Sequence, residues 1–450
     1  MMKEEYMNFV NMCFNKFLIF IFIFSFVVLA FSTTSFAGNV DINTYSPHCL
    51  LMESSTGKVI YEKSAYEKIY PASTTKIMTA ILTLEHCSLT DIATVSHEAI
   101  YSVPVGYSHA YLQEGEELTI EQLLNVLLIP SANDAANVLA EHIAGSISSF
   151  ATMMNTKAAE IGCTGTHFVN PNGIHNKNHY STAYDLALMG RYAMQNETFR
   201  KIVTTTKYTL PSTNKFPEPT RFFKATNDLI IPDSRDCVDN YYYFYATGIK
   251  TGYTNAAGNC IVASAKKDGV EYIVVILGAE RLENGLSARY IDCKNLFNYA
   301  FEHYKIYTIN QENTVLKQVT ISNSSFATKH LNLVVQNDIT LLLKKDTDEA
   351  SINPQIDISV PLEAPIQKNS VVGTISYTID DNIYSSNLLA GNNVEKSNFT
   401  TTFLTFLSIV FVLLFLIWLL KSNNKNNRKK AKKRAAKKKK DKDNYLFWLN

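Results

Sequence analysis

A serine and a lysine three residues apart, at the expected start of an apolar helix, are the feature that most constrains this 450-residue chain. Ser73 and Lys76 belong to the segment Tyr-Pro-Ala-Ser-Thr-Thr-Lys-Ile-Met-Thr-Ala at residues 70–80. Pro71 suits the entry to a helix, and residues 77–84 supply an apolar face. Residues three apart share one helical face, so the spacing predicts that the hydroxyl and the amine meet. Such a pair combines a nucleophile with a possible base.

The Ser-x-x-Lys pattern is weak evidence by itself, because the same spacing recurs at four other serines: Ser55, Ser212, Ser264 and Ser422. A second motif, Ser131-Ala-Asn133, lies on a polar link between two helices expected within residues 118–145. Taken alone, Ser131 and Asn133 favour simple capping of the second helix. Their assignment therefore depends on a third motif.

The third motif is Lys-Thr-Gly at residues 250–252, which occurs once in the chain. Two apolar, β-branched runs follow at residues 259–265 and 271–277 and predict antiparallel strands around a Lys-Asp-Gly turn. A glycine at a strand edge leaves room for the backbone of a ligand to approach. Near the start of the chain, a hairpin is expected within residues 47–62, around a Gly turn.

The two ends of the chain predict export and membrane anchoring. Residues 1–37 contain an apolar run followed by Ser-Phe-Ala and read as a signal peptide, with an uncleaved anchor as the alternative. Residues 399–420 are mostly apolar and would span about 33 Å as a helix, enough to cross a bilayer once. The basic tail at 421–450 should stay in the cytoplasm. We therefore expect a catalytic domain outside the cytoplasm.

The charge distribution argues against nucleic acid as a partner. Residues 421–443 hold 13 lysines and arginines against two aspartates, while the whole chain has a formal net charge of +1. The rest of the chain is therefore acidic by about ten charges, whereas nucleic acid requires a basic face. The alternative for the tail is a nucleic-acid-binding arm.

Neither the histidines nor the cysteines predict a metal site or another cofactor. His175 and His179 lie four apart, but in an asparagine-rich loop and not on a helix. The six cysteines beyond the leader form no C-x-x-C pair, so we interpret them as buried thiols, with a disulfide as the alternative.

After residue 307 the pattern changes to short alternating strands, which predict a small all-β domain at 307–390. The expected strands are separated by turn residues and lie at 315–321, 331–335, 339–343, 356–360 and 371–377. Before this domain, a helix is expected at 286–304. The aromatic run at 241–245 could be a strand edge or the wall of a groove.

Together the three motifs resemble the low-molecular-mass penicillin-binding proteins, the serine-type D-Ala-D-Ala carboxypeptidases of the peptidase S11 family. Leu-Ile-Pro-Ser-Ala-Asn-Asp-Ala at 128–135, Asn-Pro-Asn-Gly at 170–173 and Gly-Ile-Lys-Thr-Gly-Tyr-Thr at 248–254 strengthen the resemblance. Leu-Glu-Ala-Pro-Ile-Gln-Lys at 362–368 is similar to the C-terminal β-domain of many members. The resemblance covers about residues 45–390.

The resemblance implies a role for each motif. Ser73 would form the acyl-enzyme, Lys76 would accept its proton, and Ser131 would relay a proton to the leaving amine. The remaining residues would bind the substrate, with the backbone of Tyr253 completing an oxyanion hole: Asn133, Lys250, Thr251, Gly252 and Tyr253. The implied substrate is the peptidoglycan pentapeptide, β-lactams would act as inhibitors, and no cofactor is needed.

The implied fold is of the α/β (α+β) class, a β-lactamase/transpeptidase-like domain at 38–306. Its antiparallel sheet would be flanked by helices on both faces and followed by the small β-rich domain and the transmembrane helix. Three alternatives stay open: a DD-transpeptidase, a class A-like β-lactamase and a non-catalytic receptor of cell-wall peptides. A class A enzyme would add a Glu-x-x-Leu-Asn loop, which is missing between Asn133 and Lys250. An apparent insertion at 234–245 leaves the local substrate preference open.

Overall fold

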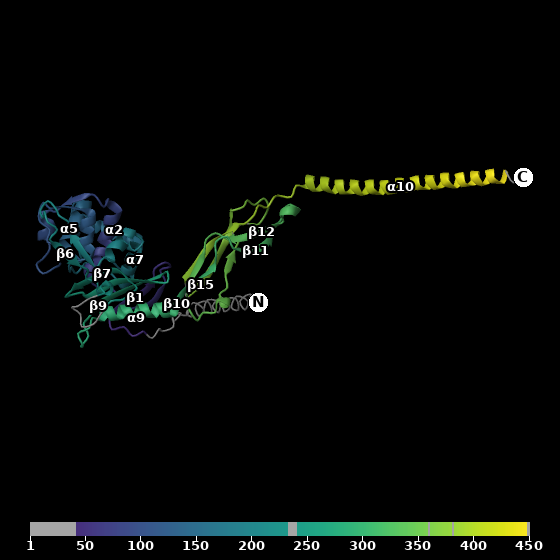
Figure 1. Ribbon diagram of the computed structural model, residues 1–450. Coiled ribbons are helices and arrows are strands. Elements are labelled where there is room, and N and C mark those ends of the chain that lie inside the picture. Colours follow the sequence, from purple (N-terminus) through teal and green to yellow (C-terminus); the bar gives the residue numbers. More distant parts are fainter. Residues whose placement is uncertain (1–41, 233–240, 359–360, 380–381, 448–450) are drawn as a thin grey trace, which may run out of the picture. The chain divides into compact units, whose positions relative to one another are not determined.

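The computed structural model describes most of the chain after the leader (Figure 1). The described residues are 42–232, 241–358, 361–379 and 382–447. The predicted signal peptide and most of the apparent insertion before the third motif lie outside them.

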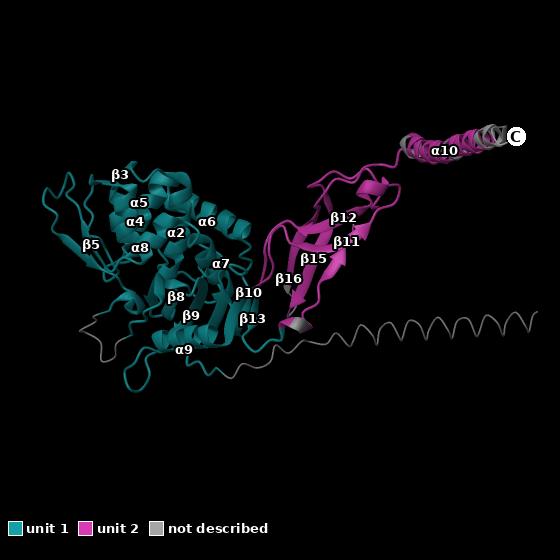
Figure 2. Cartoon of the chain, turned by 45° about the vertical axis from the view of Figure 1, so that its right-hand side comes forward, with its two compact units in different colours: residues 1–307, 342–348, 380–382 teal, residues 308–341, 349–379, 383–450 magenta. Residues whose placement is uncertain are grey.

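The chain divides into two compact units (Figure 2). The first contains residues up to Tyr307, and the second contains most of the chain after it. Leu342–Asp348, which the sequence places in the β-rich domain, belongs to the first unit. A backbone carbonyl in that segment, Leu342 O, accepts a hydrogen bond from Lys58 Nζ at 3.3 Å.

A five-stranded antiparallel sheet forms the centre of the first unit, in the order β2-β1-β9-β8-β7. Its strands are β2 (Val59–Lys63), β1 (His48–Glu53), β9 (Val270–Ala279), β8 (Gly258–Lys267) and β7 (Ala246–Thr254). The expected hairpin near the start of the chain and the two apolar strands after the third motif therefore share one sheet. The third motif lies on β7, which is an edge strand.

The central strands read as continuous apolar runs because both faces of the sheet are covered. Successive side chains of β9 alternate between two cores: Ile273 and Val275 pack in one, and Val274 and Ile276 in the other. The second core lies under α9 (Ala288–His303), and helices that include α2 and α7 cover the opposite face (Figure 1). The predicted flanking helices are thus confirmed.

Helices surround the sheet and form the helical lobe beside it. Their bounds are α2 (Lys76–His86), α3 (His97–Tyr101), α4 (Ile120–Leu128), α5 (Asn133–Ala144), α6 (Ile147–Ile161), α7 (Ala183–Ala193) and α8 (Glu197–Val203). The start of α4 carries a capping box between Thr119 and Gln122, and Gly145 ends α5 in the left-handed conformation, at φ 74°.

Short elements complete the first unit. They are the 3₁₀ helices η1 (Ala72–Thr75) and η2 (Asp228–Ile230), the pair β3 (Ile92–Thr94) and β4 (Glu117–Thr119), and the hairpin β5 (Lys207–Leu210) and β6 (Arg221–Lys224). The β5–β6 hairpin was not predicted from the sequence. Tyr241 and Tyr243 are buried in the core under α9, so the aromatic run forms neither a strand edge nor a groove wall.

A second five-stranded sheet dominates the second unit, in the order β11-β12-β16-β15-β14. Its strands are β11 (Val315–Thr320), β12 (His330–Val335), β16 (Asn382–Ala390), β15 (Val371–Ile379) and β14 (Gln355–Asp357). The strand expected at 339–343 is β13 (Ile339–Lys344), and it pairs outside this sheet with β10 (Tyr304–Asn310). The strands β10 and β16 were not predicted, and the short helices η3 (Phe326–Thr328) and η4 (Glu349–Ser351) also lie here.

The last element is the long helix α10 (Phe399–Phe447), which continues from the apolar segment into the basic one. Within it, the stretch Phe403–Lys439 contains an 18-residue window of mean hydropathy 2.9 and is long and apolar enough to cross a membrane. Its side chains are exposed, for example Phe411 at 72% and Leu414 at 60%. An apolar helix exposed in this way favours anchoring in a membrane.

The cysteines in the part of the chain that the structure describes are all free thiols: Cys49, Cys87, Cys163, Cys260 and Cys293. All of these except Cys87 are buried. Burial raises the pKa of the Cys260 thiol to about 11, so this thiol is a structural group and not a nucleophile.

Candidate active site

The hydroxyl and the amine of the first motif meet where η1 runs into α2. Lys76 Nζ lies 2.9 Å from Ser73 Oγ, and Lys76 is fully buried. Burial lowers the pKa of Lys76 well below its usual value, and the charge of Lys250 lowers it further, while Asp134 opposes both effects. Both lowering effects favour the neutral amine, the form that can accept a proton.

The other contacts of Lys76 define which way its lone pair faces. Nζ is 2.8 Å from Asn133 Oδ1 and 2.7 Å from the backbone oxygen of Asn172. A neutral amine has two N–H groups, and these two acceptors use both of them. The lone pair is left facing the Ser73 hydroxyl, whose proton it can accept.

The residues of the second motif, Ser131 and Asn133, line the same groove as Ser73. Asn133 is the first residue of α5, where its Oδ1 accepts from Lys76 and its Nδ2 donates to Ser108 O at 2.9 Å. The N-cap of α5 is Ala132, without a side-chain capping bond, so the capping interpretation is wrong. Ser131 has a φ of 68°, and its buried Oγ has no hydrogen-bond partner among the described residues. An unsatisfied buried hydroxyl that lines a groove is available to a substrate.

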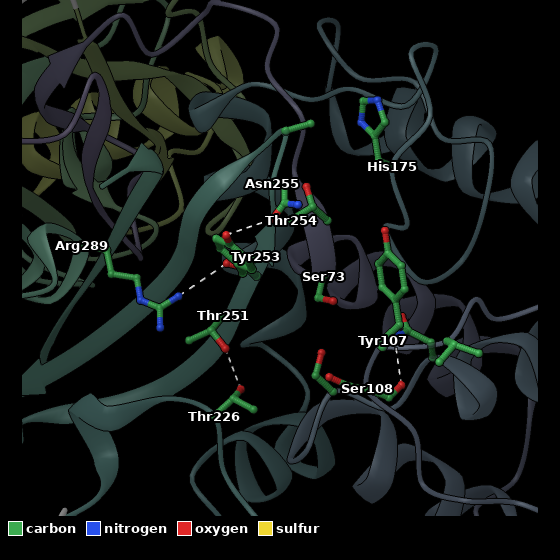
Figure 3. A pocket seen from close by; sticks show the side chains of 16 residues that line it. Ser73, Tyr107, Ser108, His175, Thr226, Thr251, Tyr253, Thr254, Asn255 and Arg289 are labelled. Atoms are coloured by element: carbon green, nitrogen blue, oxygen red, sulfur yellow. Dashed lines mark hydrogen bonds between the residues drawn. The ribbon is translucent and has the colours of Figure 1, made fainter. Parts of the chain in front are cut away.

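The third motif supplies charge and a hydroxyl from β7. Lys250 is buried and donates from Nζ to Thr251 O at 2.9 Å. Burial, together with the nearby Arg289 guanidinium, lowers the pKa of Lys250 to about 7. Thr251 Oγ1 lies 2.6 Å from Thr226 Oγ1 and also faces the groove (Figure 3).

Gly252 brings the edge of β7 against the backbone of Ser73. A Cβ atom at Gly252 would lie 2.9 Å from Ser73 N and 3.1 Å from Pro71 O, closer than real Cβ atoms approach a backbone nitrogen. Tyr253 follows at the rim with 59% of its surface exposed. The glycine thus permits a distance between strand and nucleophile that no other residue type would allow.

All three motifs border one groove of about 600 Å³ (Figure 3). Figure 3 places Ser73 between Thr251 and Tyr253 of β7 on one side and Tyr107 and Ser108 on the other. Lys76 and Lys250 lie beneath the lining and act on the groove through their contacts and charges. The groove is lined by Ser73, Val105, Gly106, Tyr107, Ser108, Ser131, Asn133, His175, Thr226, Thr251, Gly252, Tyr253, Thr254, Asn255, Ala256 and Arg289.

Arg289 is the main groove residue that the sequence did not indicate. It reaches from α9 to the groove, with Nη1 3.5 Å from Gly252 O and Nη2 3.0 Å from Tyr290 OH. Its Nε is buried and has no hydrogen-bond partner among the described residues. The guanidinium therefore brings a positive charge to the groove beside Gly252. No local pattern could have identified it, since its helix looks like any other covering helix.

The two histidines that resembled metal ligands have separate surroundings. His179 is buried against Thr75, whereas His175 lines the groove and contacts the Tyr70 ring edge-on at 4.5 Å. The described part of the chain contains no cluster of three or more His, Cys, Asp or Glu residues able to hold a metal ion.

An antiparallel sheet whose edge strand faces a buried serine–lysine pair defines a class of serine enzymes that work through an acyl intermediate. The family within that class follows from comparison with known proteins. Residues 35–281 match the model of the D-alanyl-D-alanine carboxypeptidase family, peptidase S11. Residues 301–396 match the model of the C-terminal domain of penicillin-binding protein 5. The chain belongs to the peptidase S11 family.

Individual relatives agree with this assignment. The chain is 30% identical to the D-alanyl-D-alanine carboxypeptidase DacF of Bacillus subtilis over 85% of this chain and 95% of the relative. A peptidoglycan synthesis regulatory factor, PBP3, of Streptococcus pneumoniae has a similar structure, with a TM-score of 0.65 and 25% sequence identity. The match covers 79% of this chain and 100% of that protein. The Streptomyces K15 DD-transpeptidase matches with a TM-score of 0.51 and 33% identity, covering 58% of this chain and 98% of that enzyme.

Proposed function

We propose that this protein removes the terminal D-alanine from peptidoglycan pentapeptides through an acyl-enzyme on Ser73. The observation that carries the proposal is the buried Lys76 amine, 2.9 Å from the Ser73 hydroxyl and with a lowered pKa, beside a groove that a peptide can enter. Membership of the peptidase S11 family supplies the substrate class and the expectation of β-lactam binding.

Acylation follows from the contacts of these residues. Ser73 Oγ attacks the carbonyl carbon of the penultimate D-alanine while its proton passes to Lys76 Nζ. The backbone N–H groups of Ser73 and Tyr253 stabilise the oxyanion, each typically worth about 3–4 kcal/mol. Ser131 Oγ gives its proton to the amine of the leaving D-alanine and takes up the proton held on Lys76 Nζ, and the C–N bond breaks. Asn133 holds the substrate backbone and keeps Lys76 in place.

The terminal carboxylate would lie at the far end of the groove. The Thr251 hydroxyl would donate a hydrogen bond to the carboxylate there. Arg289 approaches from α9, and its guanidinium group suits the binding of a carboxylate. Lys250 adds positive charge from beneath. These groups recognise a peptide that ends at the residue being removed, as an exopeptidase requires.

Water then hydrolyses the ester and returns the proton to the serine. An amine could replace water, which would make the protein a DD-transpeptidase. The observation that favours this second function is the similarity to the Streptomyces K15 DD-transpeptidase at 33% identity. The same groove serves both reactions, and they differ only in the acceptor.

The chain's organisation completes the proposal. Residues 38–306 would form the catalytic domain and 307–390 the β-rich domain, with residues 399–420 as a single membrane crossing and 421–450 as the cytoplasmic tail. The apolar, exposed helix α10 supports the anchor. The leader at 1–37 would direct the catalytic domain out of the cytoplasm. The β-rich domain would serve as a stalk or docking surface.

The deciding experiment is mass analysis of a pentapeptide incubated with purified ectodomain. We expect release of one D-alanine and no crosslinked dimer, and labelling of Ser73 by a fluorescent penicillin. Ser73→Ala should abolish both, while Ser212→Ala, which alters another Ser-x-x-Lys in an exposed loop, should change neither. Release of D-alanine by Ser73→Ala would reject the assignment, and crosslinked dimers would favour the transpeptidase. Penicillin labelling without D-alanine release would favour a receptor.

A further inference from the structure

We propose that His179 is a positioning residue that aims the backbone N–H of Ser73 into the groove, acting through Thr75 and the carbonyl of Ala72. The inference rests on the proposed function, because that N–H is one of the two proposed oxyanion donors. It assigns His179 and Thr75, which do not line the groove, a measurable part in acylation.

The first step is a chain of three hydrogen bonds. The Val169 N–H donates to His179 Nδ1 at 3.2 Å, so the ring proton is on Nε2. Nε2 lies 2.8 Å from Thr75 Oγ1, and Thr75 Oγ1 donates to Ala72 O at 2.8 Å. A hydroxyl has one proton, which Thr75 uses on Ala72, so Thr75 must accept from His179. The direction of every bond in the chain is therefore fixed.

The second step is the geometry of the Ala72–Ser73 peptide unit. A trans peptide is planar, with its C=O and N–H on opposite sides. A Cβ atom at Gly173 would lie 1.9 Å from Ala72 O, whereas a Cβ atom at Gly252 would lie 2.9 Å from Ser73 N. The carbonyl thus faces Gly173, and the N–H faces the edge of β7. Holding the carbonyl on its side fixes the direction of the N–H.

The third step is that this peptide unit needs support. Ala72 has a φ of 48°, in the left-handed region that residues with a Cβ rarely adopt. Such a conformation persists only where surrounding contacts hold it. Thr75 and His179 provide such a contact, since both are buried, at 0% and 1% exposure.

His179 is suited to this task because it stays neutral. Burial lowers the pKa of His179 to about 3, with further lowering from His167 and His175. The ring edge packs against Phe168 at 5.4 Å between centroids. A protonated ring would have no acceptor for Val169 N–H, so neutrality keeps all three bonds intact over the pH range in which the enzyme works.

The first test compares two buried threonines of the same segment. Thr75→Val removes the bond to Ala72 O, whereas Thr83→Val removes an equivalent buried bond to Thr79 O, 2.7 Å long, further along α2. Loss of one oxyanion donor typically lowers the rate about 100- to 1,000-fold, and a misaimed donor should have a smaller effect. We expect acylation of Thr75→Val by penicillin to be about 10- to 100-fold slower, with KM for the peptide nearly unchanged. Thr83→Val should acylate at the wild-type rate.

The second test is rescue at His179. His179→Gln retains an N–H donor near the position of Nε2, while His179→Met has similar length and no donor. We expect the acylation rate of His179→Gln to lie within about threefold of the wild-type rate. The acylation rate of His179→Met should fall by about as much as that of Thr75→Val. In the infrared spectrum of the penicilloyl-enzyme, the ester carbonyl should absorb at a higher frequency in the His179→Met and Thr75→Val variants than in the wild type, because the carbonyl has lost a hydrogen bond.

Two results would overturn the inference: equal acylation by the Gln and Met variants, or an unshifted ester carbonyl in a folded Thr75→Val. Melting temperatures identify variants that fail to fold, and if Thr75→Val is one of them, the comparison of His179→Gln with His179→Met carries the test. Failure of the proposed function looks different, since the wild-type protein would then neither react with penicillin at Ser73 nor release D-alanine.

Discussion

Lys76 and Lys250 show how one residue type acquires two roles through its surroundings. Both are buried, and each has its pKa lowered by burial and by a neighbouring positive charge. Asn133, Asn172 and Ser73 surround the Lys76 amine with hydrogen-bonding groups, which suits proton transfer. Lys250 has a backbone oxygen as its hydrogen-bond partner, and its positive charge suits the attraction of the carboxylate that we propose to bind beside Thr251.

The pKa of about 7 for Lys250 predicts a pH dependence of substrate binding. As the pH rises through 7, Lys250 loses its proton and attracts the substrate carboxylate less. We expect KM for the peptide to rise up to about tenfold between pH 6 and pH 8, the change in the protonated fraction of such a lysine. Lys250→Arg stays charged throughout and should flatten the profile. A KM that rises equally in both proteins would contradict the prediction.

At the scale of elements, the site depends on how closely β7 approaches η1. The close approach requires a glycine at 252, because a Cβ atom there would meet Ser73 N at 2.9 Å and the Ala72 side chain at 3.1 Å. The edge position of β7 leaves its outer side free of a neighbouring strand, and η1 occupies that side. The sheet edge therefore serves as one wall of the groove.

Gly252→Ala should accordingly impair catalysis more than stability. The added methyl group must push the strand or the nucleophile aside, and a displacement of roughly 1 Å can lower a rate about 100-fold. We expect penicillin acylation to fall by about this factor while the melting temperature changes little. Gly269→Asn, in the β8–β9 turn where φ is 84°, is the control, because asparagine tolerates that conformation. Wild-type acylation by Gly252→Ala would show that β7 does not constrain Ser73.

At the scale of the whole molecule, a catalytic unit, a β-rich unit and an apolar helix follow one another along the chain. The boundary between the first two is not a single point, since Leu342–Asp348 returns to the catalytic unit. Lys58 binds this segment at Leu342 O. A catalytic fragment that ends at residue 306 would therefore lose part of its own structure.

Deleting residues 399–450 should release the enzyme from the membrane without altering its catalysis. Among the described residues, the apolar stretch of α10 is the element long and apolar enough to hold the protein in a bilayer, and the residues that line the groove lie outside it. We expect the truncated protein in the soluble fraction with unchanged kcat and KM. Intact mass should show that the leader has been removed, so that an uncleaved leader is not mistaken for the anchor. Membrane retention of a protein that starts near residue 38 would contradict the model.

Features that depend only on neighbouring residues could be predicted from the sequence. The spacing of Ser73 and Lys76 places them on one helical face, and the continuous apolar, β-branched runs at 259–265 and 271–277 specify strands. The length and apolarity of 399–420 similarly indicate a membrane-spanning helix without reference to the rest of the fold. These patterns are local, so they can be read before any tertiary contact is known.

Features that require residues far apart in sequence to meet are visible only in the folded chain. It brings Arg289 to the groove and Asn172 O to the Lys76 amine, and it places His179 behind Thr75. It also turns Ser131 and Asn133 away from the capping role that their local sequence favours. The physical reason is that a hydrogen-bond partner and a shifted pKa depend on burial by other segments, and no local pattern encodes that burial.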